Sequence, residues 1–154
     1  MNFMNKEKRY IAMRTVVEIE GMEIEAVIDS GAAIGAITKE LIDELGIEID
    51  SPSNVRISTM VGKTNSLGRI NNLEMIIEGK KVIANFEVFE GKGQNNRFII
   101  LGNDWFDKNN AILDWKKRTL HIQGKDDDLR ISVKFIKEEL EEEYEEYEES
   151  EEEY

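Results

Sequence analysis

Hydrophobic and polar residues alternate early in the chain, which predicts two β-strands joined by a tight turn. The segment "RYIAMRTVVEIE" (residues 9–20) is rich in β-branched side chains, which favour strands. In "GMEIEAVI" (residues 21–28) apolar residues recur at every second position. Gly21 marks the turn between the two strands. One face of the second strand would carry Met22, Ile24, Ala26 and Ile28.

A different spacing follows and predicts a short helix. The segment "KELIDELG" (residues 39–46) has apolar residues three and four positions apart, as on one helical face. Thr38 is placed to cap its N-terminus, Glu40 lies in the first turn, and Gly46 ends it. The buried face would consist of Leu41, Ile42 and Leu45.

The rest of the chain reads as short strands with one more helix. Residues 60–68, "MVGKTNSLG", contain two glycines and look like a hairpin tip. A turn is expected at Gly79 and Lys80, and a second short helix at "NDWFDKNN" (residues 103–110), with Asn103 or Asp104 near its start. Further strands are expected within residues 47–59, 69–90, 97–101, 111–115 and 119–123. Short strands at close spacing with two short helices indicate a mostly-β, closed sheet structure.

Two segments far apart in the sequence resemble each other. "AVIDSG" precedes the first helix and "FIILG" precedes the second, and each is an apolar strand that ends in glycine. This match is short, but it suggests an internally duplicated fold.

Negative charge is concentrated at the C-terminal end. Residues 138–154 hold twelve glutamates, and removing their charges from the net charge of −13 leaves about −1 for the other 137 residues. A like-charge run of this kind repels itself and is expected to form a solvated, disordered tail. The body has no basic stripe, so direct binding of nucleic acid is not expected.

The remaining bulk properties limit the class of protein. The chain of 154 residues is long enough for one domain with its own core. It contains no cysteine, which excludes disulfides and thiolate sites. No apolar run approaches the roughly 20 residues that span a bilayer, and the start lacks the apolar region of a secretory signal. We expect a soluble, intracellular, cytoplasmic protein with no membrane partner.

Asp29 is the residue that most suggests chemistry. It ends an apolar strand and is followed by Ser30 and Gly31, in "EAVIDSGAAIGAIT" (residues 25–38). A buried strand would hold the carboxylate rigidly, and the small residues after it leave backbone N–H groups free to contact an anion. The alternative is a turn aspartate that bonds only its own backbone, which is common for Asp-Ser-Gly.

Several ordered motifs resemble the retropepsin family of aspartic proteases, over roughly residues 10–123. "VIDSGA" is similar to the family's active-site motif, and "AITKELIDELGI" to the segment and helix that follow it. "MVGKTNSLGRI" sits where the family's flap hairpin belongs. "FIILGNDWFDKNNAILDWKKRTLHI" is similar to a pattern in proteases of gypsy-type LTR retrotransposons. The resemblance implies a retropepsin-like closed β-barrel, the acid protease fold, with a flap hairpin.

The resemblance also implies an activity, that of an aspartic endopeptidase. Its chemistry needs two carboxylates that share one proton, one to activate water and one to protonate the carbonyl. This chain has a single Asp-Ser-Gly, so the simplest solution is a C2 homodimer in which each copy supplies Asp29. Ser30 would bond across the interface near the dyad, and the Gly31 N–H would orient the carboxylate.

The substrate would be an extended peptide or polyprotein, paired as an added strand beneath the flap. Its contacts are expected at positions on the active-site loop and the flap. No metal or cofactor is needed. The residues expected to line the substrate site are Ala32, Ile34, Met60, Val61 and Gly62.

Some positions depart from the family's pattern. Ile34 and Gly35 stand where many relatives carry polar residues, and Phe106 replaces the usual leucine. Retroviral members often pair an aspartate after the first motif with an arginine after the second glycine. Those places hold Ala33 and Asn103 here, which indicates the retrotransposon branch.

Other candidate residues have structural interpretations. Asp104 lies at a helix start, where the helix dipole favours a carboxylate, and Asp114 lies in a hairpin strand. Neither is followed by Ser-Gly, so neither is expected to supply the second carboxylate. His121 has no serine or cysteine motif to serve and is expected to be structural. The two tryptophans, Trp105 and Trp115, are expected to anchor the core or an interface.

Two other functional hypotheses stay open beside the protease. One is a catalytically silent retropepsin-like module that dimerises or binds peptides. The other is a cellular retropepsin-like domain, as in ubiquitin-shuttle proteins, although no ubiquitin-like or ubiquitin-binding segment accompanies it. The expected domains are an N-terminal extension (residues 1–8), the protease domain (9–136) and the acidic tail (137–154). Residues 129–136, "LRISVKFI", are the candidate interface strand.

Overall fold

The computed structural model describes residues 13–59, 62–94, 96–114, 116–117, 119–123, 128–132 and 134–135. The predicted N-terminal extension, Met60, Val61, Trp115 and the acidic tail lie outside these residues. The helices are α1 (Lys39–Leu45) and α2 (Asn103–Lys108). The strands are β1 (Met13–Ile19), β2 (Met22–Ile28), β3 (Ala36–Thr38), β4 (Arg56–Thr59), β5 (Gly62–Asn65), β6 (Gly68–Ile77), β7 (Lys80–Phe89), β8 (Ile99–Leu101), β9 (Ala111–Asp114), β10 (Thr119–Gln123), β11 (Asp128–Ser132) and β12 (Lys134–Phe135).

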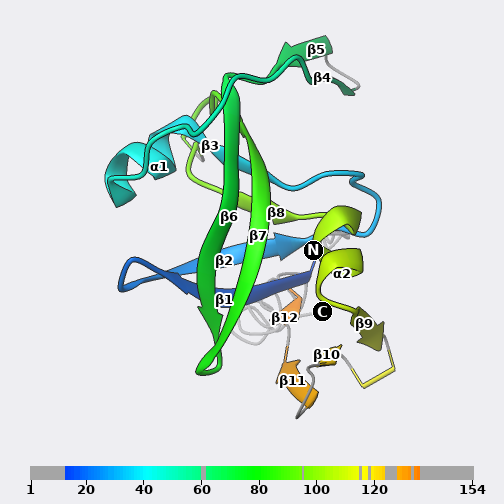
Figure 1. The fold of residues 1–154 in the computed structure, drawn as a ribbon. Coiled ribbons are helices and arrows are strands. Elements are labelled where there is room, and N and C mark those ends of the chain that lie inside the picture. The colour runs from blue at the N-terminus through cyan, green and yellow to red at the C-terminus, as the bar shows by residue number, and fades with distance from the viewer. Residues whose placement is uncertain are drawn as a thin grey trace, which may run out of the picture.

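Six strands close into a barrel, as the sequence predicted. They follow the order β1-β2-β8-β3-β7-β6, and β6 returns to β1 where Glu18 pairs with Ile76. In Figure 1 the long strands β6 and β7 cross in front of β1 and β2. The β4–β5 hairpin forms a separate two-stranded sheet that extends beyond one end of the barrel (Figure 1).

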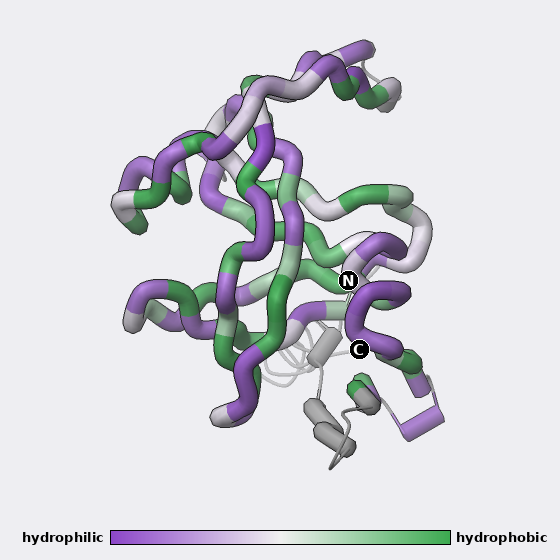
Figure 2. Tube along the Cα trace, in the orientation of Figure 1, coloured by the Kyte–Doolittle hydropathy of each residue, from purple (hydrophilic) through white to green (hydrophobic). Residues whose placement is uncertain are grey.

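The core lies inside this barrel because its strands alternate buried and exposed positions. In β1 every second residue from Met13 to Ile19 is buried, as the pleat of a strand requires. Figure 2 shows hydrophobic positions interleaved with hydrophilic ones along the barrel strands. α1 adds three buried side chains to the same cluster, and α2 adds Trp105. The most completely buried large side chains include Ile37, Leu41, Met75, Ile77, Phe86, Ile99, Leu101 and Trp105.

The first helix forms where the spacing predicted it, but its N-terminal cap differs. Gly46 ends α1 in the left-handed conformation, with φ of 74°. Thr38 occupies the N-cap position but makes no side-chain capping hydrogen bond. Its buried hydroxyl instead accepts a 3.2 Å hydrogen bond from the N–H of Phe98. The predicted N-cap position is therefore confirmed, but the hydroxyl satisfies a neighbouring backbone segment instead of the helix, which sequence spacing does not reveal.

Two hairpins turn through paired positive-φ residues that end in glycine. The β1–β2 turn uses Glu20 and Gly21, with φ of 52° and 79°. The β6–β7 turn uses Glu78 and Gly79 in the same way, and Lys80 already belongs to β7. The turn predicted at Gly79 and Lys80 was thus displaced by one residue.

The predicted hairpin tip at residues 60–68 is also shorter than expected. β5 already begins at Gly62, and its pairing with β4 joins Thr59 to Gly62 and Arg56 to Asn65. The hairpin therefore spans residues 56–65. Residues 66–68 form the connection into β6.

The C-terminal strands add to the edges of the sheets. β9, β10 and β11 form a three-stranded sheet with β11 at one edge, and β12 pairs with β1 at the edge of the barrel sheet. The candidate interface strand of residues 129–136 is thus divided between these two edges. Its proposed role between subunits stays a prediction.

Candidate active site

The loop after β2 carries Asp29, where the sequence placed it. Ala26 and Ile28 are buried in the barrel, so the strand that delivers the carboxylate is fixed by the core. Asp29 itself is half-buried, whereas Ser30 and Gly31 are exposed. A rigid strand end therefore presents a carboxylate at the surface of the protomer.

Asp29 takes part in three hydrogen bonds, of which two fix its backbone N–H and its carboxylate. Its backbone N–H donates to the carbonyl of Leu101 at 3.0 Å. The N–H of Gly31 donates to Asp29 Oδ1 at 2.8 Å, which is the contact expected from the sequence. Within the described part of the chain, Oδ2 accepts no hydrogen bond. One carboxylate oxygen is thus oriented by the backbone, and the other is available to a ligand.

The second strand of the predicted duplication supports this loop directly. β8 runs parallel to β2, with Ala26 beside Ile99 and Ile28 beside Leu101. Beyond the strands, the N–H of Asn103 donates to the carbonyl of Ala32 at 2.8 Å. The two similar segments therefore lie side by side, and the N-terminus of α2, just after β8, holds the loop that carries Asp29.

Gly102 is required at this contact because the two loops approach closely. A Cβ at this position would lie 2.6 Å from the carbonyl oxygen of Ile34 and 2.8 Å from that of Ala32. Both atoms belong to the backbone, so neither can move without shifting the loop. Sequence reasoning noted the glycine as part of a repeat but did not assign it to the site.

The structure brings together only some of the predicted substrate residues. Ala32 lies in the Asp29 turn, with its N–H bonded to the carbonyl of Asp29 at 3.1 Å, and Ile34 follows on the same loop. Both side chains are half-buried. Gly62 lies apart from them on the β4–β5 hairpin, and Met60 and Val61 lie outside the described residues.

The other candidate carboxylates have local structural partners. Asp104 Oδ1 accepts a hydrogen bond from the N–H of Trp105 at 2.8 Å, in the first turn of α2. Asp114 Oδ1 accepts one from the N–H of Lys117 at 3.0 Å, in the turn after β9. These contacts agree with the structural roles predicted for both residues. Trp105 is buried and packs edge-to-face against Phe106, with ring centroids 5.5 Å apart, so it anchors the core.

The described residues offer little for other kinds of site. They contain no group of three or more His, Asp or Glu side chains arranged to hold a metal ion. They also include no helix long and apolar enough to cross a membrane.

Comparison with curated proteins found relatives that are longer than this chain. DNA damage-inducible protein 1 of Neurospora crassa is 29% identical over 111 residues, which cover 71% of this chain and 25% of that protein. The protein of the same name from Chaetomium globosum is 29% identical over 109 residues, which cover 70% and 24%. The chain thus spans about a quarter of the length of the curated relatives it matches.

Solved structures agree on the fold. The retroviral protease-like domain of Ddi1 from Leishmania major superposes with a TM-score of 0.63 at 19% identity, covering 82% of this chain and 96% of that one. The EIAV protease complexed with the inhibitor HBY-793 gives a TM-score of 0.52 at 16% identity, covering 74% and 99%. The barrel with its few short helices is therefore retropepsin-like.

A protein-family model matches residues 15–108. This region runs from β1 through α2 and includes Asp29, Gly102 and the β4–β5 hairpin. It covers more than half of the chain. The chain therefore belongs to the retropepsin-like aspartic proteases, in the family described as "gag-polyprotein putative aspartyl protease".

Proposed function

We propose that this protein is an aspartic endopeptidase that acts as a homodimer. The observation that carries the proposal is Asp29, held at the end of β2 by the Gly31 N–H and the Leu101 carbonyl, with Oδ2 available. Asp104 and Asp114 each accept a local backbone N–H, and neither directly follows a buried strand of the barrel or precedes Ser-Gly, so we assign the second catalytic carboxylate to neither. A two-fold axis beside the Asp29 loop would supply it from a second copy.

The dyad would hold one proton between its two carboxylates. The ionised Asp29 would take a proton from a bound water as the water oxygen attacks the peptide carbonyl carbon. The protonated Asp29 would give its proton to the carbonyl oxygen, and a tetrahedral gem-diol would form. One Asp29 would then give a proton to the amide nitrogen while the other takes one from a gem-diol hydroxyl, and the C–N bond would break to release a carboxylic acid and an amine.

The neighbouring residues would support these steps. The Gly31 N–H keeps the carboxylate oriented, and Ser30, which is exposed beside it, would bond across the dimer interface. The β4–β5 hairpin would act as a flap and close over an extended peptide, which would pair as an added strand. Substrate contacts would come from Ala32, Ile34, Met60, Val61 and Gly62, of which Ile34, Met60 and Val61 would make the apolar ones.

The biological substrate belongs to the proposal as well. A gypsy-type protease would process the polyprotein that contains it, and the family description names gag polyproteins. The curated relatives carry the name DNA damage-inducible protein 1, which supports the alternative of a protease domain within a larger protein. Peptide hydrolysis by the Asp29 dyad is common to both. A cytoplasmic location and the absence of a nucleic-acid partner remain proposals.

Cleavage of a mixed peptide library, at about pH 4 to 6 where such dyads act, tests the activity. Wild type should cleave, pepstatin should inhibit, and Asp29→Asn should lower the rate by about 10³-fold or more. Asp104→Asn and Asp114→Asn are matched controls, because each changes a carboxylate that serves a local turn, and both should retain cleavage. If Asp29→Asn cleaves as wild type does, the protease proposal fails.

A further inference from the structure

Glu87 is unusual because its charge is buried. Among the residues that the structure describes, it is the one buried residue with an ionisable side chain, and that side chain is 6% exposed. It lies in β7 between the buried residues Phe86 and Val88. Burying a carboxylate costs folding free energy unless charged or hydrogen-bonding groups pair with it. The partners of Glu87 therefore indicate its role.

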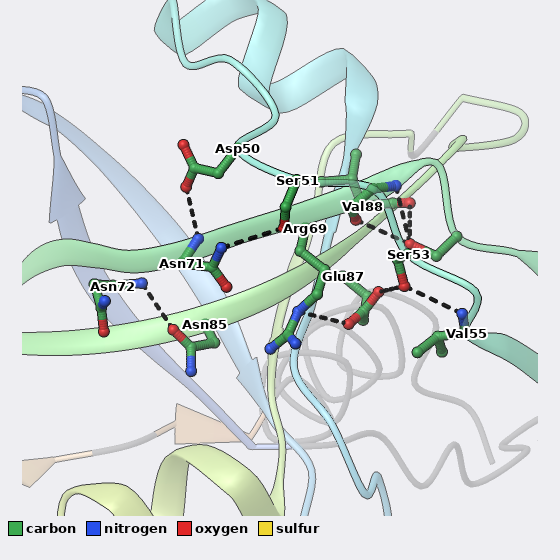
Figure 3. Close-up of polar contacts among 12 residues, drawn as sticks. Asp50, Ser51, Ser53, Val55, Arg69, Asn71, Asn72, Asn85, Glu87 and Val88 are labelled. Carbon is green, nitrogen blue, oxygen red and sulfur yellow. Dashed lines mark hydrogen bonds and ion pairs between the residues drawn. The ribbon is translucent and has the colours of Figure 1, made fainter.

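Glu87 has two such partners, and together they form the flap-base cluster (Ser53, Arg69 and Glu87). The Ser53 hydroxyl donates a 2.6 Å hydrogen bond to Glu87 Oε1. Arg69 Nε lies 3.1 Å from Oε2 as an ion pair. Figure 3 shows the carboxylate of Glu87 between Ser53 on one side and Arg69 on the other.

The contact with Ser53 continues into the backbone of the β4–β5 hairpin. The same hydroxyl that donates to Glu87 accepts a 3.1 Å hydrogen bond from the N–H of Val55, the residue before β4 (Figure 3). In turn, the Val55 carbonyl accepts a 2.8 Å hydrogen bond from the N–H of Ser66, just after β5. Glu87 is thus connected to both ends of the hairpin through one serine.

Arg69 connects the same carboxylate to the chain that leaves the hairpin. It is the second residue of β6, and its backbone exchanges hydrogen bonds with Ser51 at 2.9 and 3.3 Å. The neighbouring Leu67 N–H donates to the Val88 carbonyl at 2.7 Å. The segments that lead into and out of the hairpin therefore meet at one buried carboxylate on β7.

We infer that Glu87 is a positioning residue that fixes the angle of the β4–β5 hairpin relative to the barrel through Ser53 and Arg69. This inference rests on the proposed function in one respect, since the hairpin acts on substrate only if it is a flap. A hairpin held at its base loses less conformational freedom when a peptide binds beneath it. The flap-base cluster then contributes to substrate affinity without touching substrate.

The kinetic test uses Ser53→Ala, with Ser51→Ala as its matched control two residues earlier. Ser53→Ala should raise KM roughly five- to tenfold and leave kcat within about twofold, as expected for loss of a hydrogen bond to a charged group that affects binding alone. Ser51 contacts Asn71 rather than Glu87, so Ser51→Ala should leave both values unchanged. Ser53→Thr keeps the hydroxyl and should restore KM.

A second test does not depend on catalysis. The chain has no cysteine, so Ser58→Cys on the exposed face of β4 gives a unique site for a nitroxide label. The label should become more mobile in Ser53→Ala and in Glu87→Gln, but not in Ser51→Ala. The effects of Ser53→Ala and Glu87→Gln should also be non-additive, because both interrupt one contact.

The outcomes separate the two proposals. If Asp29→Asn abolishes cleavage but Ser53→Ala matches Ser51→Ala in KM and in label mobility, the positioning role is wrong and the protease stands. If the protein cleaves nothing and the label still becomes mobile in Ser53→Ala but not in Ser51→Ala, the cluster holds the hairpin and the protease proposal fails. If Glu87→Gln does not fold, Ser53→Ala decides the question by itself.

Discussion

The backbone N–H of Asp29 donates a 3.0 Å hydrogen bond to the carbonyl of Leu101. Asp29 directly follows β2 and Leu101 ends β8, and these parallel neighbouring strands lie far apart in the sequence. The position of the proposed catalytic carboxylate is therefore set by a segment that supplies no reactive group. Changes to that segment should lower activity without altering the chemistry of the dyad.

Gly102→Ala tests this dependence. The added methyl would lie 2.6 Å from the Ile34 carbonyl oxygen, so the Asp29 loop must move away from β8. Overpacking of this kind costs about 1–3 kcal/mol of unfolding free energy. We expect kcat to fall by roughly tenfold or more, since small displacements of catalytic groups are costly.

Gly79→Ala is the control for that experiment. Gly79 has a positive φ, of 82°, whereas Gly102 has a φ of −103°, and a Cβ at Gly79 would meet nothing within 4 Å. Its cost should be about 1–2 kcal/mol of backbone strain alone, measured by urea unfolding. If kcat falls in Gly79→Ala as much as in Gly102→Ala for the same loss of unfolding free energy, Gly102 has no specific role.

Gly68→Ala should loosen the base of the hairpin. Gly68 has a positive φ of 154°, and a Cβ there would clash with Ile49 Cγ2 and lie 3.0 Å from the Ser51 carbonyl oxygen. We expect a loss of roughly 1–3 kcal/mol in unfolding free energy and faster amide exchange in residues 62–68. Adding Ile49→Ala removes the closest clashing atom, so the double variant should recover part of the loss relative to Ile49→Ala alone. No recovery would mean that the Ile49 contact does not explain the cost.

Two paired glutamates should differ in their contribution to stability because they differ in burial. Glu87 is 6% exposed, whereas Glu44, which pairs with Arg97 at 2.6 and 3.0 Å, is 41% exposed. Glu87→Gln should cost roughly 1–3 kcal/mol, and Glu44→Gln less than about 1 kcal/mol because water screens the pair. Urea unfolding of both variants measures the difference, and equal costs would show that burial of Glu87 is not the cause.

Much of the fold followed from local pattern. Alternation in residues 22–28 predicted β2, helical spacing predicted α1, and Gly21 and Gly46 marked the ends of elements. The β6–β7 turn was misplaced by one residue within a local pattern, whereas the error at Thr38 came from a tertiary contact. The Thr38 hydroxyl accepts a hydrogen bond from the Phe98 N–H instead of one from α1. The sequence around Thr38 does not predict this partner.

The site was predicted less completely than the fold. The Asp29–Gly31 contact could be anticipated because it is local and its residue types permit it. The support from Gly102 and Asn103 depends on the parallel pairing of β2 with β8, of which the sequence showed only a short repeat. The flap-base cluster was missed, although a single glutamate within the apolar run of β7 was a usable signal.

Subunit mixing tests the central claim, that two copies of Asp29 form one active site. Wild type and Asp29→Asn are mixed in equal amounts, allowed to exchange, and assayed at the same total concentration as wild type alone. If both aspartates are needed, only wild-type homodimers cleave, and the activity falls to about one quarter. If each chain cleaves by itself, the activity falls only to about one half, and the account of the shared dyad is contradicted.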